Sequence, residues 1–257
     1  MRIIIVVILL SILSLSCKED KQQSETLTYD SVPITTVNEE AKKHFKQAQF
    51  LVQNGLDAHP IMQYQKAIAL DSTFVRMYNF ISIYAPNDSI KKSNHELAKK
   101  YKHLVSEAEQ LLVDATEYRF EHPNDHAEKL LFKVAELYPS DKYIYHTICF
   151  LLFRKNPSLA ITAGKKSIAI DPNYGSGYNI LGYAYMRNDE LEKAEKAFDN
   201  YIRCEPNKGN PYDSKADVLL LMGRYKEALI LKQKAYTLDT TLNWIPDEII
   251  DIKKKIK

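Results

Sequence analysis

The sequence predicts an all-α fold, a solenoid of about six helix pairs followed by one more helix at the C-terminus. The first observation is a period of 34 residues, which separates Tyr178 from Tyr212 in two windows of similar composition. The second is the recurrence of small residues, such as Gly182 and Ala194, where two helices of one pair would cross closely. The third is Pro206, which cannot continue a helix interior and therefore separates one unit from the next.

The spacing and these residue types resemble the tetratricopeptide repeat (TPR), whose unit is two antiparallel helices. The resemblance implies a right-handed superhelix over residues 41–242, with large side chains such as Tyr185 and Phe198 filling the space around the small ones. The spacing matches well in the last three units and fairly in the first. The second and third units are divergent, although their helical pattern is good.

The first 16 residues predict a signal peptide. Ile3–Leu15 is an apolar run interrupted only by two serines, and it is shorter than the roughly 20 residues of a membrane-spanning helix. The run ends at Cys17, and this arrangement resembles a bacterial lipoprotein signal, in which the cysteine is lipidated and becomes the new N-terminus. A simple secretory signal with an incidental Cys17 is the alternative. By the same resemblance, the absence of Asp directly after Cys17 favours the outer membrane.

Residues 17–40 are polar and predict a flexible tether, because they carry too little apolar surface to form a core. Residues 243–257 predict a capping helix for the last repeat. Its lysines near the C-terminus suit the helix dipole and solubility.

Composition excludes several classes of protein. A net charge of +2 gives no electrostatic footprint for nucleic acid, so we expect no nucleic-acid partner. Three cysteines are too few for a disulfide-stapled scaffold. We expect Cys149 and Cys204 to be free thiols, with a disulfide as the alternative that an exported compartment would permit.

No segment carries a convincing catalytic or metal-binding motif. Gly175–Gly177 lacks the flanking pattern of a nucleophile elbow, and Gly164–Ser167 lacks the first glycine of a phosphate-binding loop. His122 and His126 have helical spacing, but a Pro-Asn-Asp sequence separates them. The sequence therefore predicts no catalytic residue, no metal site, no cofactor and no enzyme.

The concave face of the solenoid is the informative surface, since the first helix of each TPR unit lines it. The residues that the register places there are candidates for contact with a partner: Arg76, Asn79, Tyr145, Asn179, Tyr183, Met186, Asp213 and Asp217. Asn179 could hydrogen-bond a bound backbone, and the tyrosines and Met186 could pack on apolar side chains. A solvated or partly packed helix face is the alternative.

These observations favour a membrane-anchored adaptor of the bacterial cell envelope that binds a peptide or protein partner in its groove. The lipid would raise the local concentration of partners held at the same membrane. The alternative is an accessory sensor or carrier that binds a small ligand or glycan. A pocket enclosed by the divergent second and third units would favour that alternative.

Overall fold

The computed structural model describes residues 31–53, 60–122 and 128–256. These ranges contain thirteen α-helices and one 3-10 turn, and no strand occurs within them. The predicted signal peptide and Cys17 lie outside the described residues. No helix of the described ranges has both the length and the apolar composition needed to cross a bilayer.

The helices form six consecutive antiparallel pairs and a final single helix, as the sequence predicts. The first three pairs are α1 (Glu39–Gln53) with α2 (Pro60–Leu70), α3 (Val75–Tyr84) with α4 (Asp88–Tyr101), and α5 (Glu107–Glu121) with α6 (Glu128–Leu137). The next three are α7 (Lys142–Leu152) with α8 (Pro157–Ile170), α9 (Gly175–Arg187) with α10 (Leu191–Cys204), and α11 (Asn210–Leu221) with α12 (Tyr225–Leu238). The single helix α13 (Ile245–Ile256) packs on α12 as a cap, and the turn η1 (Lys102–Leu104) precedes α5.

Local sequence signals set where these helices begin. Ser106 and Glu109 form a reciprocal capping box at the start of α5, and the Asp141 carboxylate accepts hydrogen bonds from the first backbone amides of α7. Pro157 occupies the first turn of α8, where its missing N–H costs nothing. The tight turn after α11 contains Gly223, whose φ of 73° few other residues adopt.

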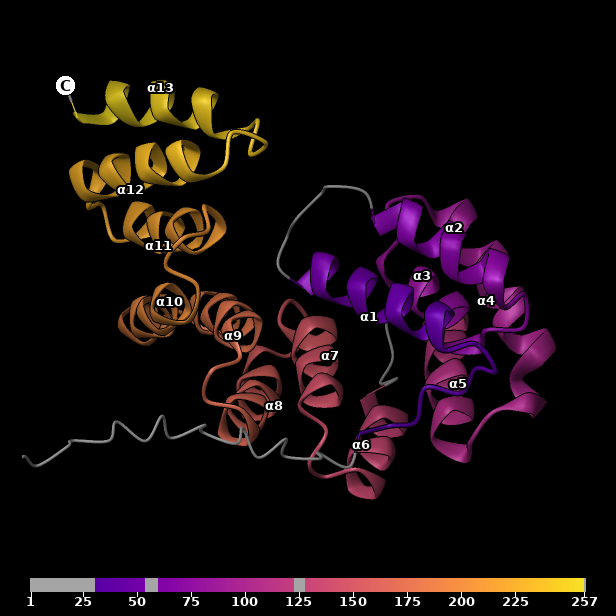
Figure 1. Ribbon diagram of the computed structural model, residues 1–257. Helices are drawn as coiled ribbons and strands as arrows, with labels where there is room; N and C mark the ends of the chain where they lie inside the picture. The colour runs from indigo at the N-terminus through magenta and orange to yellow at the C-terminus, as the bar shows by residue number, and fades with distance from the viewer. Residues whose placement is uncertain (1–30, 54–59, 123–127, 257) are drawn as a thin grey trace, which may run out of the picture.

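The pairs stack into a curved solenoid, with α1–α5 at one end and α11–α13 at the other (Figure 1). One apolar core runs through α5–α11, and a second, rich in aromatic rings, joins α1, α2 and α3. The curvature of the solenoid brings α1 close to the C-terminal units. The ammonium of Lys208, which precedes α11, lies 4.6 Å from the ring centre of Phe50 in α1.

Residues 31–38, which we call the strap, lie along the first four units instead of extending away from them. The backbone N–H of Val32 donates to Asp141, 2.7 Å away, and Thr35 donates to Glu109 through both its backbone and its hydroxyl. The Thr36 hydroxyl donates to Asp71, which follows the first pair. Of the segment predicted as a tether, residues 31–38 are therefore bound, and the tether stays a prediction only for the residues before 31.

Candidate binding groove

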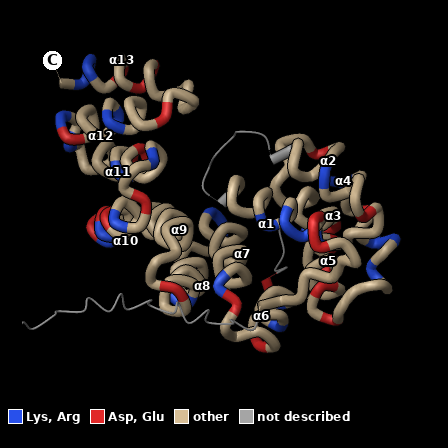
Figure 2. Tube along the Cα trace, in the orientation of Figure 1, with Lys and Arg blue, Asp and Glu red and all other residues tan. Residues whose placement is uncertain are grey.

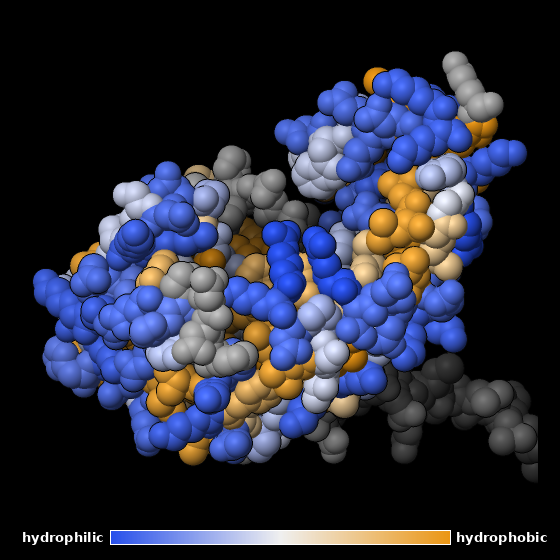
Figure 3. All heavy atoms as spheres, turned by 180° about the vertical axis from the view of Figure 1, so that it is seen from behind, coloured by the Kyte–Doolittle hydropathy of each residue, from blue (hydrophilic) through white to orange (hydrophobic). Residues whose placement is uncertain are grey.

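A groove of about 810 Å³ lies on the concave side of the solenoid. Five helices and the turn after α7 line it, and most of the lining side chains are apolar or aromatic: Val52, Tyr84, His146, Phe150, Phe153, Arg154, Ser176, Asn179, Ile180, Tyr183, Met186, Arg187, Asp217, Leu220 and Leu221. Figure 3 shows the surface hollowed between the C-terminal units and the rest of the molecule, with apolar residues exposed beside the hollow. The volume is within the range of typical ligand pockets.

The walls of the groove carry little charge. Helix α7 has one charged residue, Lys142 at its start, and α9 has one, Arg187 at its end. Figure 2 shows the contrast with α10 and α12, which carry charges of both signs. Arg154 and Arg187 are the two arginines among the lining residues, so the described rim of the groove is weakly basic.

Two buried polar atoms on the groove wall have no hydrogen-bond partner among the described residues, Oδ1 of Asn179 and Nδ1 of His146. Burial lowers the pKa of His146 to about 4, so the imidazole is neutral near pH 7. A buried polar atom without a partner costs free energy, and a bound molecule could supply the missing hydrogen bond. We therefore expect a bound molecule to form hydrogen bonds at these two atoms of the groove wall.

Tyr183 and Asp217, both predicted for the groove, line it and also brace its wall. The Tyr183 hydroxyl donates to the Asp217 carboxylate, 3.0 Å away, and its ring packs edge-on against Phe198 with 5.3 Å between the ring centres. Burial raises the pKa of Tyr183 well above its usual value, and the nearby Asp217 charge adds to that effect. The phenol therefore stays protonated and remains a donor.

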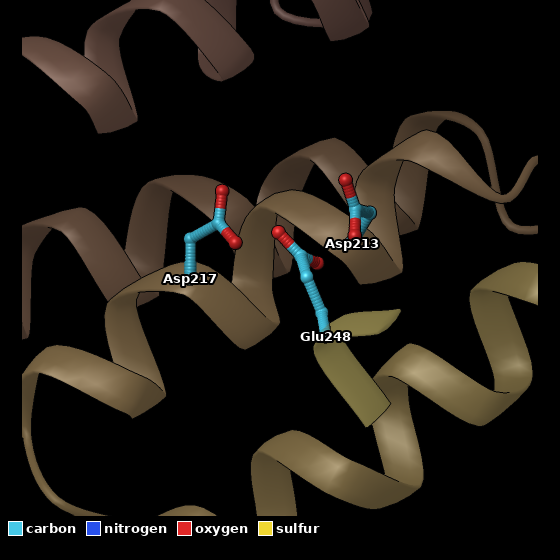
Figure 4. Close-up of side chains that lie close together, drawn as sticks. All are labelled: Asp213, Asp217 and Glu248. Carbon is cyan, nitrogen blue, oxygen red and sulfur yellow. The ribbon is translucent and has the colours of Figure 1, made fainter. Parts of the chain in front are cut away.

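Asp213 and Asp217 belong to an ion network at the last unit, in which Asp213 is buried and Asp217 is partly exposed. Figure 4 shows their carboxylates, both from α11, directed toward Glu248 of α13. The ammonium of Lys232 lies among them, 2.7 Å from Asp213, 2.7 Å from Asp217 and 2.6 Å from Glu248. Burial lowers the pKa of Lys232, but the charges of Asp217 and Asp213 outweigh that effect and raise it.

This network explains what Asp213 does. The three carboxylates come close enough to one another to resemble a metal cluster, but the ammonium already supplies the cation between them. Asp213 is 5 % exposed and also accepts a hydrogen bond from the indole N–H of Trp244. Its carboxylate therefore links α11 to Lys232 of α12 and to Trp244 just before α13, and it does not line the groove.

The remaining predicted groove residues lie elsewhere. Arg76 and Asn79 line a second, smaller cavity between α3, α5 and α7. Tyr145 is 5 % exposed and packs in the main core, with its hydroxyl directed at the Ala135 carbonyl. The large groove thus brings together Asn179, Met186 and the bracing pair, but not the other four residues.

In the fourth unit, the groove face of α7 lies one residue later in the sequence than the predicted face, which contains Tyr145. His146, Phe150 and Phe153 line the groove there, whereas the residue one position earlier, Tyr145, points into the core. A signal for the correct register is in the sequence, because His146 follows Pro139 by the same seven residues that separate Asn179 from Pro172. One residue turns a helix by about 100°, which is enough to move a side chain from the groove to the core.

The other candidate positions of the sequence have structural roles. Cys149 and Cys204 are free thiols, as expected, and burial raises the pKa of Cys149 to about 12. Gly164 lies inside α8, where an added Cβ would come within 3.1 Å of the Cys149 sulfur. His122 is exposed at the end of α5, and His126 lies outside the described residues.

No protein-family model matches this chain, and no curated protein matches it. Three solved structures titled "Crystal structure of MamA", "MamA MSR-1 C2" and "MamA RS-1 ArsTM double mutant" are similar to it, with TM-scores of 0.45, 0.47 and 0.44. The identities are 21 %, 19 % and 15 %, over 55 %, 64 % and 80 % of this chain and 91 %, 93 % and 98 % of the matched chains. The TPR-like fold follows from the six antiparallel helix pairs themselves.

Proposed function

We propose that this protein is an adaptor of the bacterial cell envelope that binds an extended segment of a partner protein in its concave groove. The observation that carries the proposal is the buried, unpartnered Oδ1 of Asn179 on a mostly apolar wall. A backbone N–H of an extended segment can donate to this atom, while the segment's apolar side chains cover Phe150, Phe153 and Met186. Burial of such side chains contributes roughly 25 cal/mol per Å².

The charge of the groove suggests the composition of that segment. Arg154 and Arg187 are at the groove, whereas Lys232 already balances the charge of Asp217. A segment with apolar residues flanked by an acidic residue would complement this surface, mainly by faster and more specific association.

Binding would be tested with the full-length tagged protein purified from gently solubilised membranes. The test variant combines Asn179→Ala with Met186→Ala and leaves the bracing Tyr183 intact. Ile230→Ala is the control, because Ile230 is an apolar side chain, 63 % exposed, that does not line the groove. We expect a stoichiometric partner with the wild type and the control, and its loss from the test variant. Equal recovery of the partner with all three proteins would show that binding occurs elsewhere.

Lipidation of Cys17, with residues 1–16 removed, would anchor this adaptor in the outer membrane. Stable anchoring needs more than one acyl chain, as a lipoprotein modification would provide. Cys17→Ser should move the protein from the membrane fraction to the soluble fraction, and the wild type should carry the added mass of the acyl chains. An unmodified Cys17 in the mature protein would contradict the anchor without affecting the groove proposal.

A further inference from the structure

The strap connects the two apolar cores of the solenoid and leads directly into α1. Val32 is 1 % exposed and belongs to the core that runs through α5–α11, whereas Ile34 packs against the core of α1, α2 and α3. Asn38 then caps α1, because its side-chain oxygen accepts a hydrogen bond from the backbone N–H of Ala41, 3.1 Å away. No further residue separates the strap from α1, so the start of α1 must follow the position of the strap.

Buried carboxylates hold the strap at the starts of α3, α5 and α7. The residues that supply them, Asp71, Glu109 and Asp141, are 8 %, 1 % and 2 % exposed. They accept hydrogen bonds from the strap at 2.6, 2.9 and 2.7 Å, respectively. Hydrogen bonds to a charged acceptor are stronger than neutral ones, and a buried carboxylate that loses its donors is costly. The strap therefore ties the start of α1 firmly to the second, third and fourth units.

The far end of α1 is attached more weakly. Figure 1 shows α1 reaching from the N-terminal units toward α7 and α9. Phe50, near the end of α1, is 46 % exposed, and the centre of its ring lies 4.6 Å from the Lys208 ammonium. A cation over an exposed ring is a weaker contact than a hydrogen bond to a buried carboxylate. Of the two attachments of α1, the strap is therefore the stronger.

The position of α1 affects the large groove because one wall of the groove comes from the N-terminal units. Val52 of α1 and Tyr84 of α3 line the groove on that side. The other lining residues belong to α7, the turn after it, α9 and α11. A movement of α1 away from α9 and α11 would therefore separate the two walls, even if every residue of the C-terminal units kept its place.

We propose that the strap is a conformational control on the width of the groove: attached to Asp71, Glu109 and Asp141, it holds α1 near the C-terminal units, and its release lets α1 move away and the groove widen. Because strap and groove wall are joined through α1, their coupling is reciprocal. A segment bound between both walls would keep the strap attached, and strap release would weaken that segment's binding. Only this last consequence rests on the proposed adaptor function.

The test measures the width of the groove without any partner, by double electron–electron resonance on the purified full-length chain in mild detergent. Spin labels are attached at Gln47→Cys in α1 and Ile230→Cys in α12, two exposed positions that do not line the groove. Cys17 and Cys204 are first replaced by Ser, while Cys149 stays because it is buried and does not react with the label. The distance between the two labels reports the separation of α1 from the C-terminal units.

The variant that releases the strap combines Val32→Asp with Thr35→Val and Thr36→Val. It places a new carboxylate beside Asp141 and removes both hydroxyl donors of the strap. We expect a longer and broader distribution of distances between the labels than in the wild type. Thr237→Val is the control, since its hydroxyl bonds only within α12, and it should leave the distribution unchanged.

A second pair of labels, at Lys66→Cys in α2 and Lys92→Cys in α4, shows whether the N-terminal units stay folded. We expect the same distance between these labels in every variant. If the triple variant broadens this distance, the milder pair Thr35→Val and Thr36→Val decides the outcome, because it keeps Val32 in the core. That milder variant must still lengthen the first distance while leaving the second unchanged.

Three results would overturn the proposal. An unchanged distance between α1 and α12 after strap release would show that the strap does not set the width. Equal widening by Phe50→Leu, which keeps the strap, would assign that role to the contact with Lys208. Broadening of the second distance in every variant that widens the groove would make the strap a stabiliser of the N-terminal units only. These distances need no partner, so failure here is distinguishable from failure of partner capture through Asn179 and Met186.

Discussion

The C-terminal helix pairs (α7–α12) and the N-terminal pairs (α1–α6) are packed in different ways. In the C-terminal pairs small residues let the helices approach, and a Cβ added to Gly182 would lie only 2.5 Å from the ring of Phe198. In the N-terminal pairs large rings fill the space, since Phe45 lies 5.6 Å from Phe74 and 5.5 Å from Phe80 between ring centres. The strap then ties Asp71, Glu109 and Asp141 together from outside.

The difference explains why the repeat pattern is clear in one half and faint in the other. Close crossing of two helices requires a small residue at a fixed place, so the 34-residue spacing is visible wherever crossing is close. Aromatic rings can fill the same space from several different sequence positions, so they leave no fixed spacing. The strap adds contacts between residues far apart in the chain, and these leave no local sequence pattern. The following predictions test this division, from the largest expected effect to the smallest.

Replacing the buried cation of the last unit should have the largest effect. Lys232→Met leaves the buried Asp213 facing Asp217 and Glu248 without a cation. A buried charge that loses its partner costs about 3–5 kcal/mol, which is the upper end for this network because Asp217 and Glu248 are partly exposed. Urea unfolding would measure the loss of stability. Lys226→Met, at an exposed position of the same helix, is the control and should change little. A stable Lys232→Met protein would mean that the acids are not held together by this lysine.

The two halves should respond differently to acid. Burial lowers the pKa of His146 to about 4, below the unfolded value of 6.5, so the unfolded state binds more protons between these values and stability falls as the pH drops through this window. The loss should approach about 3 kcal/mol near pH 4. At His95, in the N-terminal half, burial also lowers the pKa, but Glu117 opposes that effect, so its contribution should be smaller.

Unfolding free energies between pH 4 and 7 would separate the two histidines. His146→Gln should flatten the pH dependence more than His95→Gln does. If both variants flatten the pH dependence of stability equally, nearby charges offset the burial of His95 and of His146 to the same degree.

Enlarging a close helix crossing should damage the C-terminal half. Gly182→Leu must displace the fully buried ring of Phe198, and overpacking of this kind typically costs about 1–3 kcal/mol. Differential scanning calorimetry would show a lower melting temperature. Lys196→Leu adds the same side chain at an exposed position of α10 and should leave that temperature nearly unchanged. An unchanged melting temperature for Gly182→Leu would contradict the repeat register.

Removing the strap's side-chain hydrogen bonds should loosen the N-terminal half. Thr35→Val combined with Thr36→Val deletes the bonds to Glu109 and Asp71, for a loss of about 1–3 kcal/mol. Thr237→Val is the matched control, because its hydroxyl bonds only to its own helix. Hydrogen exchange should become faster in α1–α5 and stay the same in α9–α12. Uniformly faster exchange would mean that the strap stabilises the whole solenoid.

The groove illustrates how far sequence reasoning reaches. Asn179, Tyr183 and Met186 were predicted and do line it, because the strong repeat around Gly182 fixes the rotation of α9. Tyr145 is predicted from a spacing of 34 residues to Asn179, but Pro139 and Pro172 are only 33 residues apart, so the lining residue is His146, one position later. Repeat spacing predicts which face of a helix lines the groove only where the first residue of that repeat unit is known without error.

The sequence by itself determined the helix pairs, their number, the close crossings and the capping helix. These features depend on residues near one another in the chain, whose spacing and size follow directly from helix geometry. The tertiary structure alone decided that Lys232 occupies the space between three acids, that the strap binds Asp71, Glu109 and Asp141, and that Arg76 and Arg119 line one cavity. Those relations join residues from different units, so they depend on the curvature of the whole solenoid, which no local spacing encodes.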